Sequence, residues 1–203
     1  MTTTTAQKKT SRTPKPKTAS TPTKKLSEDL PTNPFAFEVL ELVSSQKTND
    51  KKVELLKRYG DLSLKAIFIW NFDESLISSL PEGDVPYAST GEQNSFSGTV
   101  SDKVRDAVGK MEELGSNSLG MNDQGQTTIR KEYTRFYNFI RGGNDGLSSL
   151  RRETMFINML QGLHPLEAEI LILVKDKRLG TKYNISKEIV SEAYPDIKWG
   201  NRV

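Results

Sequence analysis

The sequence predicts an all-α fold, in which six to eight short helices form a compact domain behind a disordered, basic N-terminal tail. Three observations lead to this prediction. Apolar residues recur at helical spacing from Phe35 onward, and capping residues and glycines bound the segments that carry them. Two segments near the C-terminus, around 150–161 and 166–175, are apolar on nearly every side and are expected to form the buried centre.

The predicted tail covers residues 1–33 and the predicted domain covers residues 34–203. The tail is rich in Thr, Lys and Pro, with almost no large apolar side chains. It therefore cannot offset the roughly 1–2 kcal/mol of backbone entropy that each ordered residue costs, and we expect it to be disordered. Residues 1–27 contain seven cations and no acid, so the rest of a chain with a formal charge of +3 carries −4.

Capping residues and glycines predict the helices of the first half. Asn33 with Pro34 suits a helix start, Gly60 suits an end, and Asp61 suits the next start. The expected helices are 34 to about 45, 49 or 50 to 59, and 62 to about 70, with a short turn of helix at 74–79.

The middle of the chain is poor in apolar residues. Pro81–Tyr87 is expected to be an extended loop that its prolines stiffen. Residues 88–128 are rich in Gly, Ser, Asn and Gln and allow one modest helix between Asp102 and Leu114. Because so long a loop is unusual inside a compact domain, we interpret 88–128 as a flexible insertion.

The C-terminal part carries the strongest apolar pattern. Residues 129–141 predict a helix that the glycines after Arg141 end, and 147–163 predicts a central, buried helix. Residues 166–175 fit a buried strand as well, but Glu167, Ala168 and Glu169 favour a helix. A last helix is expected at 186–194, with Trp199 packing down the terminus. The stripe expected to be buried on the first of these helices consists of Ile129, Tyr133, Phe136, Tyr137 and Ile140.

Composition excludes several kinds of site. The chain has no cysteine and one histidine, His164, so a zinc site with the usual nitrogen and sulfur ligands is excluded. Carboxylates still allow a magnesium or calcium site in principle. No apolar run reaches the roughly 18 residues that span a bilayer, and the N-terminus lacks the apolar core of a signal peptide. We therefore expect an intracellular, soluble protein without a cofactor and without membrane contact.

Cations give the clearest functional indication. Seven positive charges on a flexible chain can neutralise phosphates and release counterions, which gives salt-sensitive binding to DNA or RNA without sequence preference. The alternative is a tail that only solubilises the protein or packs into a virion. A second basic surface is expected around Arg130, Lys131, Arg135, Arg141, Arg151 and Arg152, although surface ion pairs with Glu132 and Glu153 explain much of it. The nucleic-acid-binding candidates are Lys8, Lys9, Arg12, Lys15, Lys17, Lys24, Lys25, Arg130, Arg135 and Arg141.

Other candidate sites have simpler explanations beside them. The glycines at 142, 143 and 146 could form an anion-binding nest, but a helix end and turn need glycine too. Acids at 61, 73, 74, 82 and 84 could hold a nuclease metal, but Asp61 suits a cap and 81–86 suits a turn. His164 and the segment Asp196–Lys198 show no catalytic arrangement. The stiff loop is the expected protein-docking site, through Pro81, Glu82, Val85, Pro86 and Tyr87.

Several segments resemble an uncharacterised protein family of T-even-like bacteriophages, including cyanophages. The resemblance covers about Phe35–Val203, is interrupted at 88–128 where this chain is longer, and leaves the tail outside. It implies a phage origin and a helical domain, and it transfers no catalytic residue because the family's function is unknown. The segments that carry it are 64–87, 136–144, 152–157, 174–177 and 192–195, together with Trp199.

These observations predict a non-enzymatic, nucleic-acid-associated phage accessory protein. The tail is expected to contact DNA or RNA, and the domain to dock on replication, transcription or packaging machinery of phage or host in the host cytoplasm. The alternative is a structural component of the virion, associated with capsid, neck or tail, whose N-terminal tail threads between subunits. The sequence leaves the partner's identity and the oligomeric state open.

Overall fold

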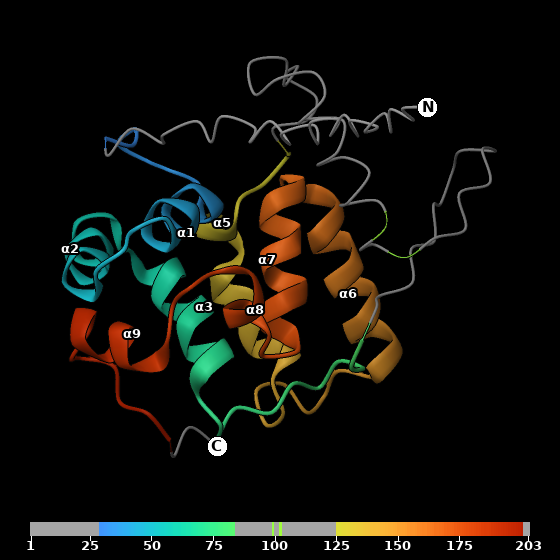
Figure 1. The fold of residues 1–203 in the computed structure, drawn as a ribbon. Coiled ribbons are helices and arrows are strands. Elements are labelled where there is room, and N and C mark those ends of the chain that lie inside the picture. The colour runs from blue at the N-terminus through green and yellow to red at the C-terminus, as the bar shows by residue number, and fades with distance from the viewer. Residues whose placement is uncertain (1–28, 84–98, 100–101, 103–124, 201–203) are drawn as a thin grey trace, which may run out of the picture.

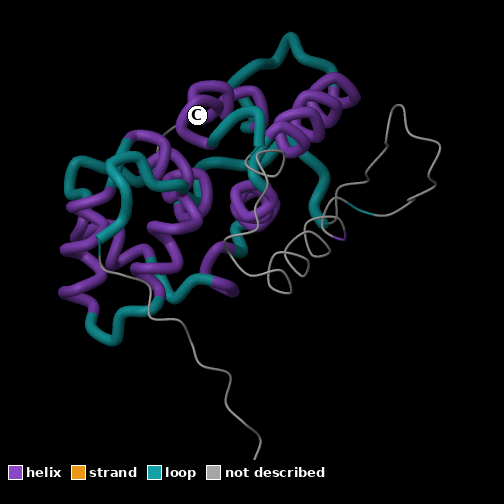
Figure 2. Tube along the Cα trace, turned by 90° about the horizontal axis from the view of Figure 1, so that it is seen from above, coloured by secondary structure: helices purple, strands orange, loops and turns teal. Residues whose placement is uncertain are grey.

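The computed structural model describes residues 29–83, 99, 102 and 125–200, and in these residues the all-α fold is confirmed. Figures 1 and 2 show helices joined by loops, with no strand in the described part of the chain. The predicted tail cations, the loop residues Val85, Pro86 and Tyr87, and nearly all of 88–124 lie outside the described residues. The helices are α1 (Ala36–Ser44), α2 (Asn49–Tyr59), α3 (Leu62–Phe72), α5 (Ile129–Glu132), the 3₁₀ helix η1 (Tyr133–Phe139), α6 (Ser149–Gly162), α7 (Pro165–Lys175), α8 (Leu179–Lys182) and α9 (Lys187–Ala193).

Two helices, α3 and α7, pack against each other at the centre of the fold (Figure 1). α3 buries Ile67, Phe68 and Trp70, and α7 buries Ile170 and Leu171. α1, α2 and α9 pack together on the α3 side, while α6 covers the opposite side of α7. Because both central helices are enclosed, their sequences are apolar on nearly every face, as a buried helix requires.

The first three helices form where capping residues predict them, with one shift. α1 begins at Ala36 rather than Pro34, because the Glu38 carboxylate accepts a hydrogen bond of 2.8 Å from the Phe35 N–H. α2 is confirmed as expected, and Asp61 caps α3 through a 2.8 Å bond from the Leu64 N–H. α3 then continues two residues beyond Trp70.

The predicted turn of helix at 74–79 is wrong. Ser78 instead forms an isolated antiparallel bridge with Ile140, in which the Ser79 N–H donates to Phe139 O and the Arg141 N–H donates to Ile77 O, both at 2.8 Å. Pairing with the chain after η1 satisfies backbone groups that a turn of helix would have satisfied locally.

The predicted helix at 129–141 is wrong beyond its first turn. α5 has four residues and continues as seven residues of 3₁₀ helix. A 3₁₀ helix repeats every three residues, so Tyr133, Phe136 and Phe139 share one side. Phe136 and Phe139 are buried against Trp70, whereas Tyr137, expected on the buried stripe, is 52% exposed.

α6 is not the central helix that its sequence predicts. It lies at the edge of the fold (Figure 1), and it buries only Phe156, Met159 and Leu160. Leu150, in its first turn, is 76% exposed. α7 takes the central place instead, and the prediction of helix rather than strand for 166–175 is confirmed.

The C-terminal segment closes the fold against α2. α9 and the packing of Trp199 are confirmed: the Trp199 Nε1–H donates to Ser191 Oγ at 2.9 Å. The Tyr194 hydroxyl donates to Leu56 O at 2.6 Å, and a Cβ at Gly60 would lie 2.0 Å from that hydroxyl. Gly60 is therefore required by this close approach, not by a left-handed helix end, because its φ is −70°. The short helix α8 was not predicted.

Candidate functional site

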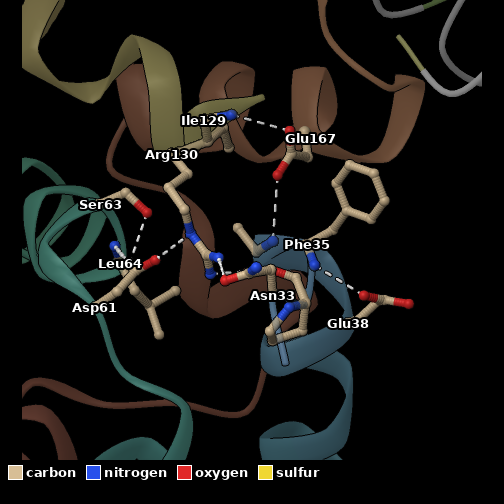
Figure 3. Close-up of polar contacts among 11 residues, drawn as sticks. Asn33, Phe35, Glu38, Asp61, Ser63, Leu64, Ile129, Arg130 and Glu167 are labelled. Carbon is tan, nitrogen blue, oxygen red and sulfur yellow. Dashed lines mark hydrogen bonds and ion pairs between the residues drawn. The ribbon is translucent and has the colours of Figure 1, made fainter. Parts of the chain in front are cut away.

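A cleft lies where the chain enters the folded domain, between the start of α1, the α2–α3 junction and α5. We name it the tail-root cleft; its volume is about 320 Å³. Figure 3 shows how three charged side chains from distant parts of the sequence meet there. Its polar lining is formed mainly by Asn33, Asp61, Ser63, Arg130 and Glu167.

Arg130 is the centre of this cleft. Its Nε–H donates to Asp61 Oδ2 at 2.6 Å, Nη1 donates to Asn33 Oδ1 at 2.8 Å, and Nη2 donates to Pro34 O at 3.2 Å. Burial opposes the ionisation of Asp61, but bonds from Ser63 Oγ and Leu64 N and the charge of Arg130 outweigh it and hold the pKa of Asp61 below its ordinary value. Arg130 thus joins the root of the tail to the start of α3 (Figure 3).

Glu167 forms the floor of the cleft, where the N-termini of three helices meet. From the first turn of α7, its carboxylate accepts from Ile129 N at 3.0 Å and from Ala36 N at 3.2 Å, the first residues of α5 and α1 (Figure 3). Helix N-termini favour negative charge, so the position suits a carboxylate. Burial is nevertheless the larger effect and raises the pKa of Glu167.

Two further contacts hold the residues just before α1. Asp29 forms an ion pair with Arg58 at 2.8 Å, and the Leu30 N–H donates to the Tyr59 hydroxyl at 3.2 Å. Together with the bonds from Arg130 to Asn33 and Pro34, they fix the point at which residues 1–28 join the domain. The cleft therefore fastens the root of the tail: Arg130 pairs with Asp61, and Glu167 holds the first residues of α1 and α5.

A family comparison covers most of this domain. A model described as a family of unknown function (DUF6433) matches residues 39–107 and 115–181, which is more than half of the chain. The chain belongs to the DUF6433 family. No curated protein and no solved structure matches it.

The DUF6433 match includes Asp61, Arg130 and Glu167, and it leaves out the tail and its root. It also runs through most of 88–128, so the interruption expected there is limited to 108–114. The cleft therefore belongs to the matched domain, and the seven tail cations lie outside the match.

The second basic surface expected from sequence is only partly available to a partner. Arg130 is engaged in the cleft, and Arg135 pairs with Glu132 at 2.9 Å. Arg152 donates to the carbonyls of Asn138, Asn144 and Leu147 at 2.7–3.1 Å. Arg141 and Arg151 are exposed. Within the glycine-rich loop at 142–146, the Asn144 carbonyl accepts from Arg152, and a loop that binds a cation in this way does not suit an anion-binding nest.

The acids and the histidine have structural partners. Asp73 is buried. Its carboxylate accepts hydrogen bonds from Ser75 N and Gly200 N at 3.0–3.2 Å and from Ser75 Oγ at 2.7 Å. His164 caps α7 by accepting from Leu166 N at 3.2 Å and stacks on Phe37. Glu74 and Glu82 are exposed, and Asp84 lies outside the described residues. Within the described ranges, no group of three or more potential metal ligands was found.

A lysine that sequence reasoning missed holds the predicted docking loop. Lys175 Nζ is fully buried and donates to Pro81 O at 2.7 Å and to Gly83 O at 3.0 Å, and it pairs with Asp176. Pro81 and Glu82 themselves are exposed. The only sequence signal was a lysine at the end of an all-round apolar segment.

Among the described helices, none is long and apolar enough to cross a membrane.

Proposed function

We propose that this DUF6433 protein is a nucleic-acid-associated accessory protein, whose N-terminal tail binds DNA or RNA and whose helical domain holds the tail in place. One observation carries the proposal: seven cations without an acid in residues 1–27 precede a remainder that carries −4. A basic segment without acids can neutralise phosphates without reading sequence.

The structure supports the second half of the proposal through the root of the tail. Asp29, Leu30, Asn33 and Pro34 each contact α2 or Arg130 within six residues of chain. The arm therefore leaves the domain from a fixed point, and a nucleic acid bound by it stays tethered to the domain by at most the length of residues 1–28. Arg130 and Asp61 pair with each other and Glu167 accepts from two backbone N–H groups, so these three side chains hold the fold together, which favours a binding role for this protein over catalysis at the cleft.

The biological setting is part of the same proposal. We place the protein in a phage of the T-even-like group, acting in the host cytoplasm beside replication, transcription or packaging machinery, with Pro81–Tyr87 as the docking loop for a phage or host protein. Mass spectrometry of purified particles would test this setting. Many copies of the chain per particle would contradict it and favour a structural component of the virion.

Two matched variants of the full chain test the binding. The first replaces Lys8, Lys9 and Arg12 by Gln, and the second replaces Arg135, Arg141 and Arg151 by Gln, so each removes three positive charges. Fluorescence anisotropy with a random-sequence 20-bp duplex at fixed low salt should show a clearly larger loss of affinity for the tail variant. Replacing all seven tail cations should abolish binding. Equal losses from the two triple variants would contradict the proposal, because they would show that net charge alone matters.

A further inference from the structure

A surface formed by α1, α7 and α8 gathers negative charge. We name it the acidic face: Glu38 and Glu41 lie one turn apart on α1, and Glu169 lies on α7. Lys182 of α8 forms an ion pair with Glu169, and its positive charge lowers the pKa of Glu41. Three carboxylates and one ammonium leave these four groups with a net charge of −2.

Glu41 lies within electrostatic reach of the other three charged groups. Burial raises the pKa of Glu41, Lys182 opposes the rise, and the carboxylates of Glu38 and Glu169 add to it. A further cation placed here would reduce the repulsion among the carboxylates, and opposite charges a few ångströms apart at a protein surface attract each other measurably.

An unpaired hydroxyl lies beside the same carboxylates. Tyr183 is buried, and its hydroxyl has no hydrogen-bond partner among the described residues. Burial raises its pKa, and the charges of Glu41 and Glu169 raise it further, so the hydroxyl lies within electrostatic reach of both. Lys182 Nζ lies 5.6 Å from the centre of its ring. Unpaired buried polar atoms are rare in native proteins, and among the described residues only the Tyr183 hydroxyl and Trp70 Nε1 are of this kind.

The chain itself contains a segment of matching charge. Residues 1–28 lie outside the described structure and carry seven cations, and they join the domain at Asp29, seven residues before α1 begins. An extended chain spans about 3.3–3.6 Å per residue, so Lys25 reaches about 14 Å from Asp29 and Lys8 about 70 Å. α1 is about 13 Å long. Several tail lysines can therefore reach the acidic face.

We propose that the tail docks on the acidic face of its own domain when no nucleic acid is bound, and that nucleic acid competes with this face for the same lysines. The docking stands on the charges of the chain alone, while the competition rests on the proposed function. The docking lowers the apparent affinity of the tail for nucleic acid, because nucleic acid must first displace the acidic face. The effective concentration of this face near the tail is high, since both belong to one chain.

Carbodiimide cross-linking of the full chain tests the docking. This reagent joins a lysine directly to a carboxylate that touches it, and mass spectrometry identifies the pair. At low salt, lysines from residues 8–25 should link to Glu41 or Glu169 in preference to the exposed acids Glu54 and Glu192, and the links should disappear at high salt. An equal mixture of ¹⁵N-labelled and unlabelled protein should give links within one copy only. Links between copies, or links spread evenly over all four acids, would overturn the proposal.

A pair of charge-matched variants tests the competition. Glu41→Gln with Glu169→Gln should raise the affinity of the full chain for random-sequence DNA by about threefold or more at low salt, since a weaker internal competitor is displaced more easily. Glu54→Gln with Glu192→Gln changes the net charge equally and should have a smaller effect. Equal gains would overturn the competition. Cross-links to the acidic face without any DNA binding would support the docking and contradict the proposed function.

Discussion

Single buried cations fasten loops to the helices of this protein. Lys52 donates to Asn184 O at 2.6 Å, Lys175 to Pro81 O and Gly83 O, and Arg152 to three carbonyls around the turn after η1. Except for Asn138 O in η1, the carbonyls that these charged donors satisfy lie outside the helices. Such bonds matter chiefly because losing the donor leaves buried acceptors unsatisfied.

Lys175→Met should therefore destabilise the domain strongly. The substitution keeps most of the apolar stem but removes the donor to Pro81 O and Gly83 O and the partner of Asp176. We expect a loss of about 3 kcal/mol in the free energy of unfolding, measured by urea denaturation. Lys57→Met, at an exposed position, should change it by no more than about 0.5 kcal/mol. A small effect at Lys175 would show that the buried ammonium is not what holds the loop.

Glu167 should give the stability a specific dependence on pH. Its pKa in the folded protein is raised above its ordinary value of 4.5, so the folded state binds this proton more tightly than the unfolded state. Its contribution to stability is therefore full below about 4.5 and is lost as pH rises through the raised pKa.

Comparing the full chain with Glu167→Gln isolates that contribution, because Gln does not titrate and all other groups are shared. The free energy of unfolding of the natural protein minus that of the variant should increase between pH 7.5 and pH 5. A decrease over this range would mean that the ionised carboxylate at the three helix N-termini is net favourable, and that burial is not the larger effect on Glu167.

At the scale of the element, the period of the 129–140 segment decides which aromatic side chains enter the core. With α-helical spacing Tyr137 would be buried, whereas with 3₁₀ spacing Phe139 is buried between Trp70 and Phe156. Pairing of Ile140 with Ser78 favours the tighter winding, because the chain must become extended directly after η1.

Alanine substitutions distinguish the two periods. Phe139→Ala should cost about 3–5 kcal/mol of unfolding free energy, since it leaves a cavity in the core. Tyr137→Ala should cost less than about 1 kcal/mol, because the ring is half exposed. Thermal or urea unfolding of both variants checks this. The reverse order would restore the α-helical interpretation of the sequence.

The sequence predicted well those helices whose bounds depend only on residues next to them in the chain. Asp61 caps α3 through its own side chain, and the Asn49 start of α2 and the α7 helix need no distant partner to be recognised. The place of α6 at the edge could not be predicted, because its apolar content resembles that of a central helix. The tail-root cleft could not be predicted from neighbouring residues either, because Arg130 bonds to Asp61 and Asn33, which lie 69 and 97 residues away in the sequence.

At the scale of the whole molecule, the distribution of charge is the main property to explain. Sequence alone revealed that seven cations precede a remainder of −4, and the structure adds that the root of the cationic segment is held at Arg58, Tyr59 and Arg130. The acidic face begins on α1, the first helix after that root. Under our two proposals, nucleic acid and the domain itself compete for this one set of charges.

The salt dependence of DNA binding tests the role of the tail most directly. The logarithm of the binding constant of the full chain, plotted against the logarithm of salt concentration, should fall with a slope between about −3 and −6, because three to seven tail cations each release about 0.9 counterions from duplex DNA. The chain with all seven tail cations replaced by Gln should bind too weakly for a slope to be measured. A steep slope that survives this replacement would contradict a binding role for the tail, since the charges that contact DNA would then lie on the folded domain.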